Sequence, residues 1–273
     1  MTLPADAPVG SGQPVSSAPA AAALVIEDVY AGYGGGDVLR GVSFAVPEGG
    51  ITCLVGPNGC GKSTMLATIS GLLRARRGSI TFRGKSLVGL SPRQVLAAGI
   101  VHVPQNHSLF RDMTIRENIE LGAYTISDRQ LIASRLAAVE QMFPQVDEWR
   151  GTRAGSLSGG QQRLVEFARC LMLDPKLVIL DEPSVGLAPK IRKSVFDAVR
   201  AMNAAGKTLL LVEQNARAGL CLSSHGVVME GGQVRMEGTG REVLEHPEIG
   251  ALYLGGTVGA ASGTEAGRSE TGP

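Results

Sequence analysis

A glycine-rich segment ending in lysine, serine and threonine has the composition of a phosphate-binding loop. Residues 56–64 fit the pattern G-x-x-x-x-G-K-[ST] and lie between an apolar run and an expected helix. Glycines let backbone N–H groups converge on phosphate oxygens, and a helix N-terminus adds partial positive charge. We expect Lys62 to bridge the β- and γ-phosphates and Ser63 to ligate Mg²⁺. The nucleotide-binding residues predicted here are Gly56, Pro57, Asn58, Gly59, Cys60, Gly61, Lys62, Ser63 and Thr64.

Two acidic residues follow a second apolar run. Leu177–Leu180 leads directly into Asp181 and Glu182. In open α/β sheets, ligands bind at the carboxyl ends of the strands. We expect Asp181 to hold Mg²⁺ through water, and Glu182 to activate the attacking water as a general base, a role worth ~10²–10⁴-fold in rate. The alternative is an acidic turn that caps the helix expected to begin near Pro189.

A serine followed by two glycines forms a further anion-binding element. Ser158 is a good helix N-cap, and the N–H groups of Gly159 and Gly160 and the helix dipole are expected to point outward. We therefore add Ser158, Gly159, Gly160 and Gln161 to the predicted nucleotide-binding residues. The alternative is a capped helix that holds no ligand.

The composition suits one large α/β domain or two small ones. The chain has 273 residues, of which 44% are apolar, 4% aromatic and 19% charged. Its net charge of +1 gives no electrostatic case for nucleic acid as the main partner. Four cysteines without C-x-x-C spacing favour reduced thiols over disulfides or metal. We expect Cys60 to be open to alkylation, because a helix N-terminus lowers the pKa of a thiol.

The elements that must position these residues alternate along most of the chain. We expect strands at 24–29, 42–46, 51–55, 79–82, 100–103, 177–180, 208–212, 227–230 and 233–236. We expect helices at 62–72, 92–98, 127–143, 160–173, 189–204 and 215–222. This alternation predicts a mainly parallel sheet with right-handed crossovers. Residues from about 106 to 158 lack strand-like runs and are expected to form a helical insertion.

Both ends of the chain differ in composition from the rest. Residues 1–22 and 256–273 are rich in Ala, Gly, Ser and other residues that cannot repay the cost of ordering, so we expect a disordered leader and tail around a folded domain at 23–255. We expect no cleaved signal peptide. The sequence also has no apolar run near the ~18–20 residues of a membrane span, so we expect membrane association through a partner.

The three motifs, in this order around a helical insertion, closely resemble those of ABC-type ATPase subunits. The resemblance covers about residues 24–254. It implies an α/β fold of the P-loop NTPase class: a mainly parallel sheet core, an antiparallel β portion and a helical subdomain. It also implies ATP and Mg²⁺ as ligands and ATP hydrolysis as the reaction.

The resemblance assigns roles to further residues. Gln105 matches the loop glutamine that touches Mg²⁺ and senses the transport partner, and Tyr33 matches the aromatic residue that stacks on adenine, unless it is a plain turn tyrosine. Gln214 replaces the usual switch histidine. A glutamine can hydrogen-bond to the γ-phosphate or to the attacking water but cannot carry positive charge. We therefore place Gln214 beside the catalytic residues Lys62 and Glu182 as a contact, not as an acid or base. The matching interface loop, 184–188, ends in Ala188 where many members carry Asp.

Residues 181–189 together with 211–215 resemble the ATP-binding subunits of branched-chain amino acid importers, whose relatives carry urea and other small solutes. The resemblance implies three partners: a second ABC ATPase subunit (a sister chain or a second copy), transmembrane permease subunits, and an extracytoplasmic solute-binding protein that acts indirectly. It also implies that the protein works at the cytoplasmic face of the plasma membrane, held there by the permease. No nucleic-acid partner is expected.

The motifs suggest a shared site. If the element at 158–160 faces away from its own phosphate loop, each ATP must be clamped between two subunits arranged head to tail. ATP binding then closes the pair, and hydrolysis reopens it. One alternative is a soluble ABC ATPase that acts on nucleic acid, the ribosome or an assembly scaffold, which the neutral charge disfavours. Another is a regulator without turnover, which the intact Lys62, Asp181 and Glu182 disfavour.

Overall fold

The computed structural model describes residues 21–247 and residue 249. The predictions of a disordered leader and tail therefore concern residues almost wholly outside the described part. Within the leader as predicted, Ala22 is already the first residue of a strand. Among the described residues, no helix is long and apolar enough to cross a membrane.

A six-stranded sheet with the order β10-β9-β3-β8-β7-β6 forms the centre of the molecule. Five of its strands are parallel, and the edge strand β10 returns antiparallel to β9. Their bounds are β3 Ile51–Val55, β6 Ile100–Val103, β7 Leu177–Asp181, β8 Thr208–Val212, β9 His225–Glu230 and β10 Gln233–Gly238. This confirms the predicted mainly parallel core.

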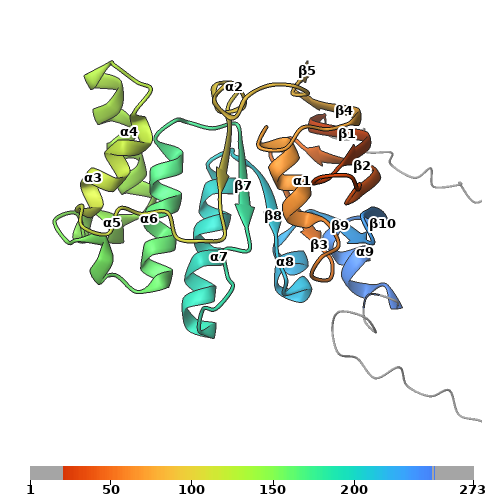
Figure 1. Cartoon of the computed structure of the whole chain (residues 1–273). Coiled ribbons are helices and arrows are strands. Elements are labelled where there is room, and N and C mark those ends of the chain that lie inside the picture. The colour runs from red at the N-terminus through yellow and green to blue at the C-terminus, as the bar shows by residue number, and fades with distance from the viewer. Residues whose placement is uncertain (1–20, 248, 250–273) are drawn as a thin grey trace, which may run out of the picture.

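A second sheet of four antiparallel strands lies beside the first (Figure 1), in the order β2-β1-β4-β5. It contains β1 Ala22–Ala31, β2 Leu39–Pro47, β4 Arg77–Phe82 and β5 Lys85–Ser86. Side chains of β3 alternate between two apolar clusters: Cys53 and Val55 pack among the helices, and Leu54 packs with the antiparallel sheet. The continuous apolar run of β3 is thus explained by burial on both faces.

Helices cover the central sheet and extend the chain to one side, where α3, α4 and α5 form the helical segment (Figure 1). The helices are α1 Lys62–Ile69, α2 Pro92–Ala97, α3 Ile115–Glu120, α4 Arg129–Met142, α5 Pro144–Glu148, α6 Gly159–Leu171, α7 Pro189–Ala204, α8 Ala216–Leu222 and α9 Gly240–Glu245. The helix α6 packs against both the helical segment and the sheet, so it joins the two parts.

Several element boundaries differ from the prediction for local reasons. The first helix ends at Ile69 instead of residue 72, because Gly71 adopts φ +74°. Asp128 caps α4, so this helix begins two residues after its predicted start. Pro144 begins α5 as well as ending the preceding helix.

Candidate functional site

The phosphate loop connects β3 to α1, and its glycines are needed for steric reasons. A Cβ on Gly56 would lie 2.3 Å from the backbone oxygen of Met229. Gly61 caps α1 with φ +109°, a conformation that residues with a Cβ rarely adopt. The loop can therefore present its N–H groups only with glycine at these positions.

The ammonium group of Lys62 is held inside this loop. Its Nζ donates to the backbone oxygens of Gly56 at 2.8 Å and Pro57 at 3.2 Å, and the residue is only 5% exposed. The side chain is therefore folded back over the loop whose amides are expected to hold phosphates. A positive charge placed there suits the β- and γ-phosphates of a nucleotide.

A polar pocket of about 510 Å³ brings together residues from five separate parts of the chain. The phosphate loop forms one wall, and the segments that follow β6, β7 and β8 contribute Gln105, Glu182 and Gln214. All three lie at carboxyl ends of parallel strands, the position that the sequence analysis predicted for Glu182. The lining residues are Val38, Asn58, Gly59, Gly61, Lys62, Ser63, Thr64, Gln105, Glu182, Val185 and Gln214.

The two acids predicted to act in hydrolysis have different surroundings. Asp181 ends β7, and burial, with the nearby charge of Glu182, raises the pKa of its carboxyl, which Lys62 opposes. Glu182 adopts φ +44°, a left-handed conformation that is strained for a residue with a Cβ. The Nε2 of Gln105 donates to Glu182 Oε2 at 3.1 Å. The structure thus joins the predicted general base to the loop glutamine.

The donor set suits a hard cation held together with a nucleotide. Ser63, Gln105 and Asp181 offer hydroxyl, amide and carboxylate oxygens, which Mg²⁺ prefers. Among the described residues, no group of three or more histidine, cysteine, aspartate or glutamate side chains forms a metal site.

The serine-glycine element forms a capped helix start apart from this pocket. Ser158 N and Oγ each donate to Gln161 Oε1 at 2.9 Å, which makes a capping box at the start of α6. A Cβ on Gly160 would lie 1.9 Å from Ile191 Cγ2, so packing of α6 on α7 requires this glycine. A Cβ on Gly159 would meet nothing closer than 3.4 Å. The fold of one chain therefore gives no steric reason for Gly159.

Two other predicted residues have different outcomes. Tyr33 is 63% exposed and is not among the residues that line the pocket, so stacking on adenine stays a prediction. The prediction of a reactive Cys60 is wrong. The residue is 3% exposed, and burial raises the pKa of its thiol more than Lys62 lowers it.

A buried ion pair that the sequence analysis missed holds the segment around Gln105. Arg163 on α6 donates to the backbone oxygens of Pro104 at 2.8 Å and Gln105 at 2.6 Å, and it pairs with Glu166 at 2.8 Å. Glu166 accepts in turn from Ser108 N at 2.6 Å. The available signal was the spacing of Arg163 and Glu166 by three residues on a helix whose neighbouring positions are apolar.

A second missed residue is Glu213, directly before Gln214. Its side chain is 1% exposed and accepts from Ser184 N at 3.1 Å and Ser184 Oγ at 2.9 Å. Burial raises the pKa of Glu213 to about 7. No spacing rule marks this residue, because its partner is 29 positions away on another loop.

Comparisons with known proteins agree with this geometry. Residues 39–185 match the family model described as ABC transporter. The chain is 38% identical over 233 residues to the high-affinity branched-chain amino acid transport ATP-binding protein BraG of Pseudomonas aeruginosa, covering 85% of this chain and all of that protein. It is 34% identical to the probable branched-chain amino acid transport ATP-binding protein LivF of Archaeoglobus fulgidus, covering 82% and 95% of the two chains.

A solved structure gives the same result for the fold. The crystal structure of MJ1267, an ATP-binding cassette of an ABC transporter in its ADP conformation, superposes with a TM-score of 0.78 at 30% identity, covering 86% of this chain and all of the other. The fold, the phosphate loop and the convergence of Gln105, Glu182 and Gln214 on one pocket all fit that description. The chain belongs to the ABC transporter family and is an ATP-binding, ATP-hydrolysing cassette.

Proposed function

We propose that this cassette powers an importer of branched-chain amino acids. Support comes from the similarity to BraG and LivF, whose names carry that substrate class, and from the segments 181–189 and 211–215, which resemble those of such subunits. Transport of leucine into vesicles by the reassembled complex, dependent on ATP, tests the substrate class. Uptake of another small solute with no response to leucine, isoleucine or valine would contradict it.

Hydrolysis is assigned to residues of the polar pocket. Lys62 holds the β- and γ-phosphates, and the carboxylate of Glu182 takes a proton from the attacking water. Gln214 is placed to hydrogen-bond the γ-phosphate or that water, without charge. Ser63, Gln105 and Asp181 would hold Mg²⁺, which supplies neutralisation of phosphate charge when bound. Loss of turnover with retained ATP binding in Glu182→Gln tests the role of the base.

The active unit in this proposal is a head-to-tail pair of cassettes. The observation that carries it is the position of Ser158, Gly159, Gly160 and Gln161: none of them lines the pocket that holds Lys62. Gly159 has no steric reason within its own chain, which is expected if a nucleotide approaches it from a partner. The second cassette is a sister chain or a second copy. Ser158→Arg, which blocks this approach, should abolish ATPase activity of the assembled complex.

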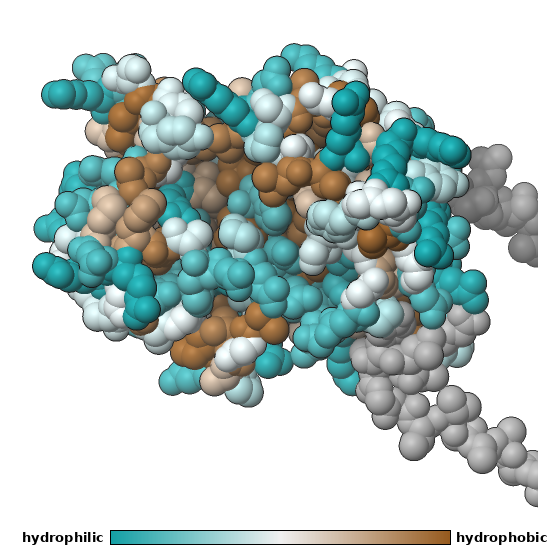
Figure 2. All heavy atoms as spheres, in the orientation of Figure 1, coloured by the Kyte–Doolittle hydropathy of each residue, from teal (hydrophilic) through white to brown (hydrophobic). Residues whose placement is uncertain are grey.

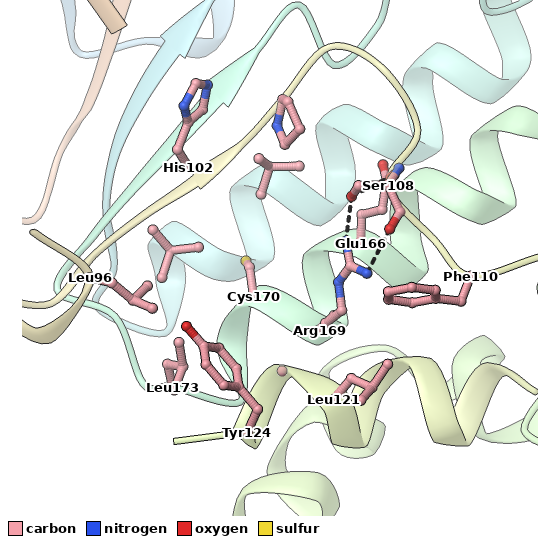
Figure 3. A pocket seen from close by; sticks show the side chains of 14 residues that line it. Leu96, His102, Ser108, Phe110, Leu121, Tyr124, Glu166, Arg169, Cys170 and Leu173 are labelled. Atoms are coloured by element: carbon pink, nitrogen blue, oxygen red, sulfur yellow. Dashed lines mark hydrogen bonds between the residues drawn. The ribbon is translucent and has the colours of Figure 1, made fainter. Parts of the chain in front are cut away.

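A permease segment is proposed to dock in an apolar groove beside α6 (Figure 3). The groove has a volume of about 410 Å³, and its lining includes exposed Phe110 and Tyr124. Figure 2 shows apolar surface in this region, between the helical segment and α2. Arg169 donates to Ser108 at its wall (Figure 3). We call this the docking groove; its occupant would be an amphipathic segment of a transmembrane subunit.

The docking groove and the nucleotide pocket meet at consecutive residues. Pro104 lines the groove, and Gln105 lines the pocket. A partner that moves this segment therefore acts directly on Gln105 and, through its hydrogen bond, on Glu182. In this arrangement the cassette is placed at the cytoplasmic face of the membrane by its permease, and a solute-binding protein on the other side acts indirectly. Tyr124→Glu should abolish co-purification with the permease while leaving ATP binding intact.

A further inference from the structure

Both carboxylate oxygens of Glu213 accept hydrogen bonds from one residue on a neighbouring loop, Ser184. Ser184 N donates to Oε1 at 3.1 Å, and Ser184 Oγ donates to Oε2 at 2.9 Å. Glu213 is 1% exposed and Ser184 is 3% exposed. Two donors from one residue, shielded from water, hold the carboxylate in a single orientation.

This contact lies just beyond the paired ends of the two neighbouring strands β7 and β8. Within the sheet, β7 and β8 pair up to Asp181 and Val212, and Glu182 N still donates to Val212 O at 2.9 Å. Glu213, the first residue after β8, donates its N–H to Leu54 O on β3 at 3.3 Å, on the side away from β7. From this point on, the side chain of Glu213 joins the segment after β8 to the segment after β7.

The segment after β7 needs such support. Glu182 has φ +44°, a conformation that costs free energy for a residue with a Cβ. A turn follows, closed by Val185 N donating to Glu182 O at 3.2 Å, and Ser184 is inside this turn. The strained residue is thus held by Val212 on one side and through Ser184 by Glu213 on the other.

We propose that Glu213 is a positioning residue for ATP hydrolysis, which clamps the turn containing Glu182 to the segment containing Gln214. The proposal rests on the proposed roles of these two residues. Because Gln214 is adjacent to the clamp and Glu182 is two residues from Ser184, the clamp fixes these two pocket residues relative to each other. Misplacement of a catalytic group by about 1 Å is enough to cost about 100-fold in rate.

Charged and titratable groups surround the clamp on several elements. The charge of Glu182 opposes ionisation of Glu213, and the charge of Arg192 on α7 favours it. Burial, and after it the charge of Glu213, raises the pKa of Cys53 on β3. Burial lowers the pKa of Arg163 on α6, and the charges of Glu166, Asp181 and Glu213 oppose this. Since burial brings the pKa of Glu213 to about 7, the clamp should weaken when this carboxyl gains a proton.

The test uses the full chain in its active assembly and measures kcat and KM for ATP in Glu213→Ala, Ser184→Ala and the double variant. We expect each single change to lower kcat by between about 10- and 100-fold, with KM within about 2-fold. The double variant should lose no more than the worse single variant, because both changes remove one contact. Glu213→Gln, which can accept from Ser184 N and donate to Ser184 Oγ, should restore most of kcat and remove any pH dependence of kcat centred near 7.

Thr208→Val is the matched control. Thr208 is 1% exposed at the other end of β8, and its Oγ1 accepts from Gly49 N at 3.0 Å. It should lose stability but keep kcat, which separates positioning from general loss of packing. Wild-type kcat in folded Glu213→Ala, equal losses in Thr208→Val, or additive losses in the double variant would overturn the inference. Full activity in Glu182→Gln would instead overturn the proposed role of the base.

Discussion

The guanidinium of Arg163 donates to the backbone oxygen of Gln105 at 2.6 Å, so the helix that begins with the serine-glycine element also holds the loop that enters the nucleotide pocket. The same side chain holds Pro104, which lines the docking groove. Three sites are thereby joined through one buried side chain: the expected partner contact at Ser158, the pocket and the groove. A movement of α6 cannot leave Gln105 in place unless these hydrogen bonds break.

Arg163→Met should therefore be far more damaging than an ordinary surface change. It removes the partner 2.8 Å from the carboxylate of buried Glu166, which keeps the weaker contact with His107 Nδ1 at 3.5 Å. Breaking a buried ion pair typically costs about 3–5 kcal/mol of unfolding free energy. Arg163→Met combined with Glu166→Gln removes the uncompensated charge and should recover part of that loss. Urea unfolding of the three proteins measures this. Equal stability of Arg163→Met and the wild type would contradict a structural role for the pair.

Glu182→Gln should bind ATP and fail to hydrolyse it. Loss of a general base costs ~10²–10⁴-fold in turnover, whereas the amide keeps the size of the side chain. The Glu182→Gln variant should therefore accumulate as an ATP-bound closed pair, which size-exclusion chromatography in the presence of ATP would show as a larger species. A variant with normal turnover would show that another group takes the proton.

The two glycines of the serine-glycine element should respond differently to alanine. Gly160→Ala places a methyl group against Ile191 and should cost about 1–3 kcal/mol of folding stability. Gly159→Ala meets no atom closer than 3.4 Å and should stay within about 1 kcal/mol of the wild type. Gly159→Ala should nevertheless reduce ATP-dependent pairing, because the added methyl group faces the expected partner nucleotide. Thermal unfolding and light scattering separate the two effects.

Burial of Glu213 should make stability depend on pH. Its pKa is about 7 in the folded chain, against an ordinary value of 4.5. Below pH 4.5 the folded and unfolded states both hold the proton, so ionisation of Glu213 does not reduce stability there. As pH rises from 4.5 toward 7, the unfolded chain ionises while the buried carboxyl stays protonated, which lowers the unfolding free energy by up to about 3 kcal/mol. Glu213→Gln cannot release a proton, so it should gain stability relative to the wild type between pH 5 and 8. A constant difference across that range would contradict the shift.

Motifs with fixed spacing were predictable from the sequence, and contacts between distant loops were not. The phosphate loop was recognisable because strand, glycines and helix are contiguous, and the structure has the strand Ile51–Val55 with the predicted bounds. The rule that parallel strands end at one edge predicted the place of Asp181 and Glu182, whereas Gln105 was assigned from the resemblance to ABC-type ATPase subunits. Arg163 and Glu213 were missed because their roles depend on partners 58 and 29 residues away, respectively.

Local burial also overturned one chemical prediction. The position of Cys60 in a phosphate loop suggested a lowered thiol pKa, but the thiol lies 3% exposed under the loop, where desolvation outweighs the nearby Lys62. Local backbone features explain two other differences. The left-handed conformation of Gly71 ends α1 early, and a capping box of Thr239 and Glu242 starts α9, a helix that the sequence analysis did not predict. The spacing of a motif shows which reactive groups a loop contains, whereas the packing around the loop decides whether water reaches them.

The most direct test of the shared site is the ATPase rate per chain as a function of protein concentration, with light scattering reporting the fraction of paired chains. If Ser158 of a partner completes each site, the rate per chain should follow that fraction and approach zero in dilute, monomeric protein. The assembled complex with permease is the positive reference. A monomeric preparation that hydrolyses ATP as fast per chain as the complex would contradict the account.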